Sequence, residues 1–529
     1  MTTATMQNVE VAPTTASATA ATTGVHSYAR NHERLAWLIV AAGAVLRIAR
    51  YAANRSLWLD EVLLATNILS RSFRGLLTPL DNDQGAPVGF LMLEKLAVTL
   101  VGGSEYGLRL VPLIAGLVSL PLFWFVAKRL LDLRIALLAT ALFAVCEPLI
   151  YYASEAKQYG LDVTVTLAIV LAALRVMEEP ARTSRLIAFA IVGLLSVWLS
   201  HPAVFVLGGT GATIIGWEWL YGRRSDALRV VGVAALWVVS FAVHYLLFMR
   251  ALGKNDYLME YWTARGGFMP WPPGPRSIMW LPRAFWEVFR DRARAPVNLL
   301  LPEIAIFAFL LGLVGLFLKA RKVLLFLAAP VALVLLAAVL RKYPFSERLI
   351  LFTTPLFLLV IAAGVGFVYD SVGQRGRLIA VLLAAALLLP SAANAAKNLV
   401  RPPGREEMKP VLHHVAQNWQ SGDVLYLYYA GAKVFDYYAP RVGLADVEPI
   451  ISTMSRADWF EYVADLETLR DKPRVWVVFM HNHKLDGVDE QKLFLMTLDR
   501  MGNRLSRFDH TDAAAYLYDL TTAEKILAQ

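Results

Sequence analysis

A series of long apolar runs between residues 35 and 396 constrains this chain more than any other feature. About 20 apolar residues in a helix are needed to cross the hydrocarbon core of a bilayer, and these runs are about 17–24 residues long. A helix in a membrane pairs its own backbone polar groups without help from water. We therefore predict a mainly α-helical membrane protein with about eleven spans. The spans are expected at 35–53, 109–127, 135–151, 158–176, 186–200, 203–220, 228–249, 298–318, 323–340, 349–369 and 378–396.

The charge of the chain supports this prediction. Charged residues make up 18% of the sequence, whereas soluble domains carry about 25%. The net charge of +9 is explained by loops on the cytosolic side of a membrane, where Lys and Arg accumulate. It does not require a nucleic-acid partner, and we expect none.

The apolar stretch 87–101 decides the topology. It contains Glu94 and Lys95 and is short for a span. If it lies along the membrane surface, most basic loop residues fall on one side, which the positive-inside rule assigns to the cytosol. A crossing there would reverse the bias, so we predict a cytosolic N-terminus and an outer C-terminus. The cytosolic basic residues are then Arg30, Arg34, Lys128, Arg129, Arg134, Arg175, Arg182, Arg185, Arg223, Arg224, Arg229, Lys319, Arg321, Lys322, Arg375 and Arg377.

This topology gathers four segments on the outer side, where any chemistry is expected. The first is predicted to carry two surface helices, one starting near Trp58 and one at Pro87. The third is rich in Trp and Arg, and it is either a lid over a site or an interfacial anchor, since Trp also gathers at membrane surfaces. The four segments are 54–108, 151–159, 251–297 and 341–348.

Two further regions flank the predicted membrane part, 28–396. Residues 1–27 are rich in Thr and Ala and lack the apolar core of a signal peptide, so we expect a disordered cytosolic tail. Residues 397–529 alternate strand-like and helix-like patterns, which predicts a small α/β domain outside the membrane. Strands are expected at 422–429, 474–480 and 514–520, and helices at 405–420, 455–469 and 488–502.

Asp60 and Glu61 follow the first predicted span and are both candidate catalytic residues. Acidic side chains at the edge of a bilayer are costly and usually functional. Adjacent residues on a helix point about 100° apart, so only one of the two is expected to face a substrate. A carboxylate at the mouth of a cavity suits a general base. The alternative is a charge at the N-terminus of a surface helix, which the helix dipole favours.

A second group of polar residues lies at span ends on the same predicted side. The cations suit a clamp for a phosphate leaving group, although Arg and Lys at span ends also reach toward lipid phosphates. Tyr159 and Tyr343 accompany them, and His201 is either a ligand or a hydrogen-bonded structural residue. The sequence contains no metal-binding pattern. The cations are Lys157, Arg341, Lys342 and Arg348.

Four short motifs occur in order along the chain: 58–61 (Trp-Leu-Asp-Glu), 84–88 (Gln-Gly-Ala-Pro-Val), 151–159 (Tyr-Tyr-Ala-Ser-Glu-Ala-Lys-Gln-Tyr) and 343–348 (Tyr-Pro-Phe-Ser-Glu-Arg). Together they resemble motifs of the GT-C glycosyltransferases, integral-membrane enzymes that use polyprenyl-phosphate sugars. The resemblance covers residues 35–396 and is closest to the family 39 branch of protein O-mannosyltransferases and lipid A aminoarabinose transferases. Two departures stand out. A single Pro87 replaces a Pro pair, and Lys157 replaces an Arg, which weakens a bidentate phosphate clamp.

The resemblance implies a role for several of these residues. Asp60 would be the catalytic base or the acid that orients the acceptor, and Glu155 would be a second acidic group of the site. Lys157 and Arg348 would hold the lipid phosphate. The residues that would assist are Lys95 and Tyr343.

The reaction implied is transfer of a sugar from a polyprenyl-phosphate carrier to an acceptor at the outer face of a bacterial cytoplasmic membrane. The acceptor is a hydroxyl or amine of a glycolipid, a polysaccharide or a protein, and its attack is expected to invert the anomeric carbon. The sequence leaves open whether a divalent cation bridges Asp60 to the phosphate. Two alternatives stay open: a ligase or polymerase that uses diphosphate-linked oligosaccharide, and a flippase of polyprenyl lipids, although no internal repeat typical of transporters is visible.

Overall fold

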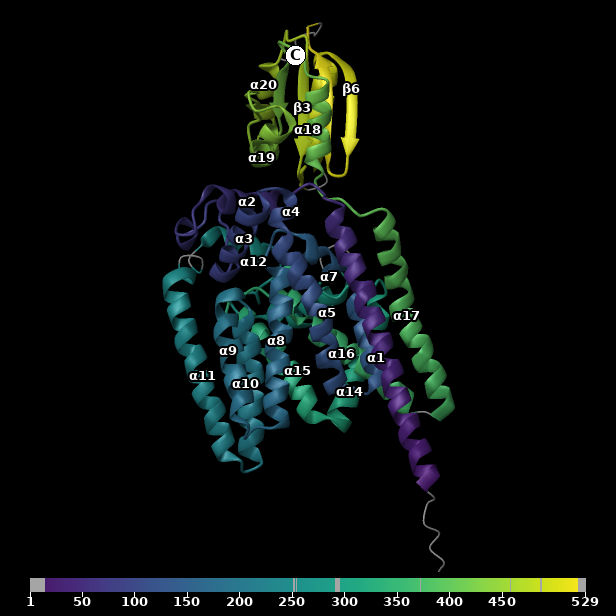
Figure 1. Ribbon diagram of the computed structural model, residues 1–529. Helices are drawn as coiled ribbons and strands as arrows, with labels where there is room; N and C mark the ends of the chain where they lie inside the picture. The colour runs from purple at the N-terminus through teal and green to yellow at the C-terminus, as the bar shows by residue number, and fades with distance from the viewer. Residues whose placement is uncertain are drawn as a thin grey trace, which may run out of the picture.

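The computed structural model describes residues 15–250, 253, 255–290, 295–371, 373–456, 458–485 and 488–521. These residues form a helical bundle that carries a smaller, β-containing part on one of its ends (Figure 1). Nine helices among them are long and apolar enough to cross a membrane, so this is a multi-pass membrane protein. These helices are α1 (Thr15–Ala52), α5 (Leu110–Leu130), α8 (Tyr159–Glu178), α10 (Ala203–Leu220), α11 (Arg224–His244, extended by a π-helical turn, Tyr245–Met249), α14 (Pro302–Lys319), α15 (Arg321–Val339), α16 (Thr354–Ser371, preceded by a 3-10 segment, Glu347–Thr353) and α17 (Gly373–Val400).

Two of the eleven predicted spans depart from a simple crossing. Helices α6 (Leu133–Val145) and α7 (Glu147–Tyr151) form a pair bent by 55°, which counts as a tenth span if the two are taken together. Helix α9 (Thr183–Leu199) is apolar but has only 17 residues. The described helices thus support nine or ten spans by length and composition, and the apolar α9 is the remaining helix of the eleven predicted.

The bend between α6 and α7 has a clear cause. Pro148 has no N–H to donate to the carbonyl of Ala144, so the helix breaks ahead of it. The guanidinium of Arg47, buried in α1, donates instead to the carbonyl oxygens of Ala144 (3.3 Å) and Phe143 (3.5 Å). A buried arginine in the first span therefore pairs the backbone groups that the break leaves open.

Short helices cover the end of the bundle that faces the β-containing part, and we call this the site end (Figure 1). The two surface helices predicted in the first outer segment are confirmed. Helix α3 has 14 residues and is not among the helices long enough to cross a membrane. The short helices are α2 (Leu59–Ser70), α3 (Val88–Val101), α4 (Glu105–Leu108), α12 (Asp256–Ala264) and α13 (Pro275–Arg290).

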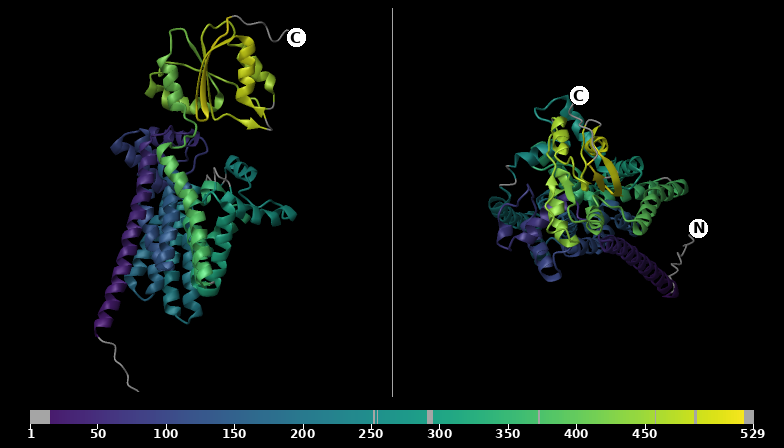
Figure 2. Two further views of the ribbon diagram at one scale, coloured as in Figure 1. Left: turned by 90° about the vertical axis from the view of Figure 1, so that its right-hand side faces the viewer. Right: turned by 90° about the horizontal axis from the view of Figure 1, so that it is seen from above.

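The C-terminal part is a five-stranded mixed sheet with helices on both sides (Figure 2). The strand order is β2-β1-β3-β7-β6. β1 pairs in parallel with β2 and β3, and β7 pairs antiparallel with β3 and β6. Alternate residues of β3 face opposite layers: Trp476 packs with α18 and α19, and Phe479 packs with α20 and α21. The elements are β1 (Val424–Leu427), β2 (Ile450–Ile451), β3 (Val475–Met480), β6 (Asn503–His510), β7 (Ala513–Asp519), α18 (Met408–Gln417), α19 (Ala432–Val442), α20 (Trp459–Glu467) and α21 (Glu490–Met501), with a separate hairpin of β4 (Lys484–Leu485) and β5 (Val488–Asp489).

Most elements of this part match the sequence prediction. The three predicted strands correspond to β1, β3 and β7, and the three helical patterns correspond to α18, α20 and α21. Strand β6 was missed because its residues are mostly exposed and polar at an edge of the sheet. At the other terminus, α1 begins at Thr15, so residues 15–27 of the expected tail are helical, in keeping with the high helix propensity of Ala. Residues 1–14 lie outside the described residues.

Candidate active site

Asp60 lies in the first turn of α2, at the site end of the bundle. Its carboxylate forms a 2.7 Å ion pair with Arg348, and its other oxygen lies 3.9 Å from the ammonium of Lys157. Burial is the largest effect on the pKa of Asp60 and raises it. Lys157, Arg348 and Arg405 outweigh burial, so the pKa lies below its ordinary value. Asp60 is therefore an ionised carboxylate enclosed by cations.

Arg348 stands at the start of the 3-10 segment that precedes α16. Its Nε donates to the hydroxyl of Tyr159 at 3.0 Å. Its guanidinium also lies within 5.8 Å of the ring centres of Trp58, Tyr159 and Trp262. Trp262 comes from α12, in the Trp-rich outer segment. Aromatic faces attract a guanidinium and restrict its orientation, so Arg348 is directed at Asp60 from a fixed position.

Lys157 connects two of the sequence motifs. Its ammonium donates to the side-chain oxygen of Gln84 at 2.6 Å, and the neighbouring Gln158 donates to the carbonyl of Gly85 at 3.3 Å. Burial lowers the pKa of Lys157, and Asp60 opposes that shift. The segment 84–88 thus holds the lysine beside Asp60.

Glu61 points away from Asp60 and into the protein. Its carboxylate accepts two hydrogen bonds from Arg109, at 2.9 and 2.7 Å, and one from the backbone N–H of Ala156, at 2.7 Å. Arg109 also donates to the carbonyls of Arg55 (2.7 Å) and Ser56 (3.0 Å). This buried pair ties the start of α2 to the segment that carries Glu155 and Lys157.

Glu155 is fully enclosed, and neither of its carboxylate oxygens has a hydrogen-bond partner among the described residues. Burial raises the pKa of Glu155 from 4.5 to about 7, and the negative charge of Glu61 adds to the effect. Arg405 and Arg348 act in the opposite direction. The side chain is thus poised to gain or lose a proton near neutral pH.

Three predicted residues contact other parts of the site end. Lys95 donates to the carbonyl of Ile68 at 2.9 Å, at the end of α2 opposite Asp60. The hydroxyl of Tyr343 donates to the carbonyl of Leu349 at 2.9 Å, next to Arg348. His201 lines a cavity of about 170 Å³ with Gln84, and burial, with His244 adding to it, lowers the pKa of His201 to about 3.

The remaining two predicted cations lie at the protein surface. Arg341 donates to the hydroxyl of Thr263 at 3.1 Å, and Lys342 is exposed. Neither has an ion pair with a carboxylate among the described residues. The structure therefore brings Lys157 and Arg348 to Asp60 and leaves Arg341 and Lys342 outside that cluster.

The linker to the C-terminal part adds residues that the sequence analysis missed. The guanidinium of Arg405 stacks on the ring of Trp58 at 3.5 Å. Glu406 accepts a hydrogen bond from the backbone N–H of Leu59 at 3.0 Å, which pairs an open donor at the start of α2. Glu407 accepts from the backbone and the hydroxyl of Ser56, at 3.2 and 2.9 Å. The only sequence signal was a charged triplet directly after Pro-Pro-Gly at 402–404.

The C-terminal part itself also contacts the first outer segment. The hydroxyl of Tyr438 accepts from the backbone N–H of Leu57 at 2.7 Å. Lys409 donates to the carbonyl of Asn54 at 3.1 Å and to Glu105 at 2.8 Å. His481, at the end of β3, pairs with Glu406 at 2.6 Å, and this hydrogen bond raises the pKa of His481. Docking of this part thus fixes the loop from which Asp60 projects.

The question of a divalent cation was left open by the sequence. The described residues contain no group of three or more His, Cys, Asp or Glu side chains arranged to hold a metal ion. The carboxylate of Asp60 faces two cations instead of further carboxylates.

Comparisons with known proteins support the fold. No protein-family model and no curated protein matches the sequence. The solved structure of ArnT from Cupriavidus metallidurans bound to undecaprenyl phosphate is similar, with a TM-score of 0.50 and 13% identity, covering 92% of this chain and 98% of that chain. The Archaeoglobus fulgidus oligosaccharyltransferase tethered with an acceptor peptide aligns with a TM-score of 0.49 and 12% identity, covering 91% and 74%. The likeness to ArnT confirms the predicted fold class, a mainly helical polytopic membrane protein with a small C-terminal mixed sheet.

Proposed function

We propose that the chain is a glycosyltransferase that moves a sugar from a polyprenyl-phosphate carrier to an acceptor at the outer face of a bacterial cytoplasmic membrane. The observation that carries the proposal is the pairing of Asp60 with Arg348 and Lys157 at the end of a membrane-spanning bundle. A carboxylate suits removal of a proton from an acceptor, and buried cations stabilise a leaving phosphate. The protein whose fold it shares was solved with undecaprenyl phosphate bound.

In this mechanism the phosphate of the donor competes with Asp60 for Arg348 and Lys157, which frees the carboxylate for the acceptor. The acceptor oxygen or nitrogen bonds to the anomeric carbon as the bond from that carbon to the phosphate oxygen breaks. The bonding electron pair leaves with the polyprenyl phosphate, and the acceptor proton passes to Asp60. A single displacement of this kind inverts the anomeric carbon.

Two further residues fit the arrival of a phosphate. Arg405 adds a third cation from the linker above Trp58. Glu155, whose pKa is raised to about 7, takes up a proton when the negatively charged phosphodiester of the donor approaches, because neighbouring negative charges favour the protonated form. Its neutral form then does not repel the donor.

The test is donor turnover by the purified full-length protein in lipid. The protein is incubated with a panel of polyprenyl-phosphate sugars and a membrane extract as the acceptor source, and release of free polyprenyl phosphate is followed. We expect release from one donor and a loss of about 10²–10⁴-fold in Asp60→Asn. Asp81→Asn is the control, since Asp81 lies in the same outer segment but is exposed and paired with Arg71.

Three other outcomes would contradict parts of this proposal. Release only from diphosphate-linked oligosaccharides would replace the proposal with a ligase or polymerase. Movement of polyprenyl lipid across the bilayer without sugar transfer would identify a flippase. A product that retains the anomeric configuration would contradict the single displacement.

A further inference from the structure

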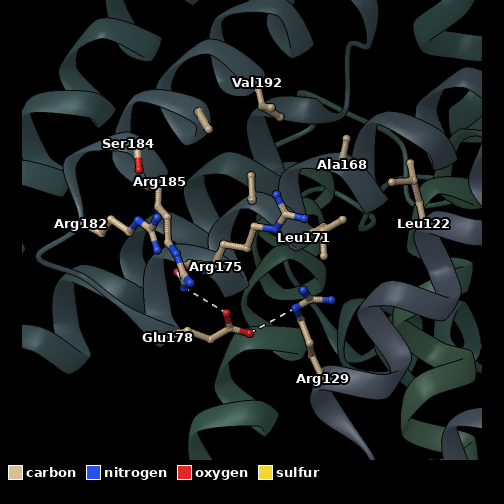
Figure 3. Close-up of a pocket in the computed structure, with 12 residues that line it drawn as sticks. Leu122, Arg129, Ala168, Leu171, Arg175, Glu178, Arg182, Ser184, Arg185 and Val192 are labelled. Atoms are coloured by element: carbon tan, nitrogen blue, oxygen red, sulfur yellow. Dashed lines mark hydrogen bonds and ion pairs between the residues drawn. The ribbon is translucent and has the colours of Figure 1, made fainter. Parts of the chain in front are cut away.

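A large cavity lies at the opposite end of the bundle from Asp60. Helix α8 begins at Tyr159, inside the candidate site, and ends at Glu178, so its last turn marks what we call the far end. A cavity of about 620 Å³ opens there between α5, α8 and α9 (Figure 3). The basic loops predict that this end is cytosolic. The chemistry proposed above makes no use of it.

The charged rim of this cavity is strongly basic. Four arginines line it against one glutamate: Arg129, Arg175, Arg182 and Arg185 against Glu178. Glu178 is already occupied, because it pairs with Arg129 at 3.2 Å and with Arg185 at 3.0 Å. Arg182 and Arg185 also pair with Glu179, at 3.2 and 2.9 Å. Glu178 and Glu179 together thus pair with three of the four arginines.

Arg175 is the remaining cation. Among the described residues no carboxylate or other acceptor pairs with its side chain, and Figure 3 shows its guanidinium extending into the cavity. Its own carbonyl accepts a hydrogen bond from Arg185 at 2.7 Å, which fixes the end of α8. A guanidinium presents five donors and binds phosphate in a planar, bidentate manner. The rim therefore offers an open anion site.

The rest of the cavity wall is apolar. Leu122 of α5, Ala168 and Leu171 of α8, and Val192 of α9 line it. Ala168 lies about 10 Å along α8 from Arg175, toward the middle of the membrane. The basic rim at the membrane surface matches the headgroup of an anionic lipid, and the apolar wall that continues from it matches an acyl chain. A soluble anion would use only the rim.

We propose that this cavity binds an anionic phospholipid, with its phosphate on Arg175 and the neighbouring arginines and an acyl chain along Leu122, Ala168 and Val192. Basic pockets between membrane helices on the cytoplasmic side commonly bind such headgroups. The binding site is separate from the sugar-transfer chemistry. A lipid bound there contacts both α5 and α9, and each of these helices packs on α8.

The experiment is native mass spectrometry of the full-length protein with phosphatidylglycerol as the anionic probe and phosphatidylcholine as the zwitterionic one. We expect the protein to retain phosphatidylglycerol in preference to phosphatidylcholine. Arg175→Gln should bind phosphatidylglycerol roughly fivefold more weakly, the amount expected for one basic residue near a membrane surface. Arg377→Gln is the matched control: Arg377 is exposed at the same end, near the start of α17, and should leave retention unchanged.

A second variant separates a lipid from a soluble anion. Ala168→Phe fills the apolar channel and leaves the arginines in place, so it should abolish retention of phosphatidylglycerol without loss of the native fold in a thermal unfolding assay. Ala168→Phe also tests the lipid proposal if Arg175→Gln fails to fold. Equal retention of the two lipids, or unchanged retention in both variants, would overturn the proposal. Displacement of the lipid by millimolar inorganic phosphate, with Ala168→Phe still binding, would show a site for soluble anions instead.

Discussion

Arg348 and Asp60 form a 2.7 Å ion pair between the segment that precedes α16 and the first turn of α2. The guanidinium is surrounded by the rings of Trp58, Tyr159 and Trp262. It is held by its surroundings as well as by its partner, and we expect it to keep its place when another anion replaces that partner. An anion that replaces the carboxylate therefore meets a preorganised donor, which is the arrangement that favours a charged transition state.

Replacement of Arg348 should reduce turnover by a larger factor than any loss of folded protein can explain. Arg348→Gln removes a charged donor from the leaving group, and we expect turnover to fall by about 10²–10³-fold. Arg348→Lys should restore only part of it, because an ammonium lacks the planar fork of a guanidinium. Polyprenyl phosphate release measures the effect. Arg341→Gln, at a partly exposed arginine of the same outer segment, is the control, and an equal loss in that variant would contradict a specific role.

Glu155→Gln should change how thermal stability depends on pH. Burial raises the pKa of Glu155 from 4.5 to about 7 in the folded protein. The folded state then binds a proton that the unfolded state releases, so the contribution of Glu155 to stability is fully present below pH 4.5 and is lost as pH rises through 7. The variant cannot ionise, and its Tm should fall less than that of the wild type between pH 5 and 8. Parallel pH profiles for the two proteins would contradict the raised pKa.

Glu61→Gln should destabilise the protein. The Glu61–Arg109 pair is almost wholly buried, with side-chain exposures of 2% and 5%, and loss of one partner of such a pair costs about 3–5 kcal/mol. The partly exposed pair of Lys128 and Glu33 supplies the control, since Glu33→Gln should cost less than about 1 kcal/mol. Thermal unfolding in a fixed lipid mixture compares them. A Glu61→Gln protein of normal stability without turnover would assign Glu61 a direct role in catalysis.

Arg405→Ala should weaken donor binding while the fold is kept. Loss of a charged hydrogen-bond partner of the donor phosphate costs about 1.5–3 kcal/mol, which corresponds to roughly 10- to 150-fold in KM for the donor. Arg401→Ala, at an exposed arginine just beyond the end of α17, controls for charge in the same linker. The KM for a polyprenyl-phosphate sugar is the measurement, and identical values for the two variants would rule out a contact between Arg405 and the donor.

The sequence predicted the fold well because membrane spans and buried strands follow simple periodic rules. Apolar length identified most of the spans, and the basic loops predicted that 87–101 does not cross, in keeping with the 14 residues of α3. Composition could not show that α9 ends after 17 residues. It also could not show that Arg47 pairs the carbonyls that the break ahead of Pro148 leaves open, because that depends on a contact between distant helices.

The candidate site was only partly visible in the sequence. Asp60, Lys157 and Arg348 fall on one predicted side, and the structure brings these three together. The orientation of Glu61 depends on its distant partner Arg109. Arg405 could not be found from a pattern either, since the docking of a linker has no periodicity.

The order of residues along the chain has a consequence for biosynthesis. Asp60 leaves the ribosome early, whereas Arg348 and Arg405 emerge only when the last helices and the linker are made. A nascent chain thus carries Asp60 and Lys157 long before it carries the two arginines. The cluster around Asp60 is therefore complete only when translation has nearly ended.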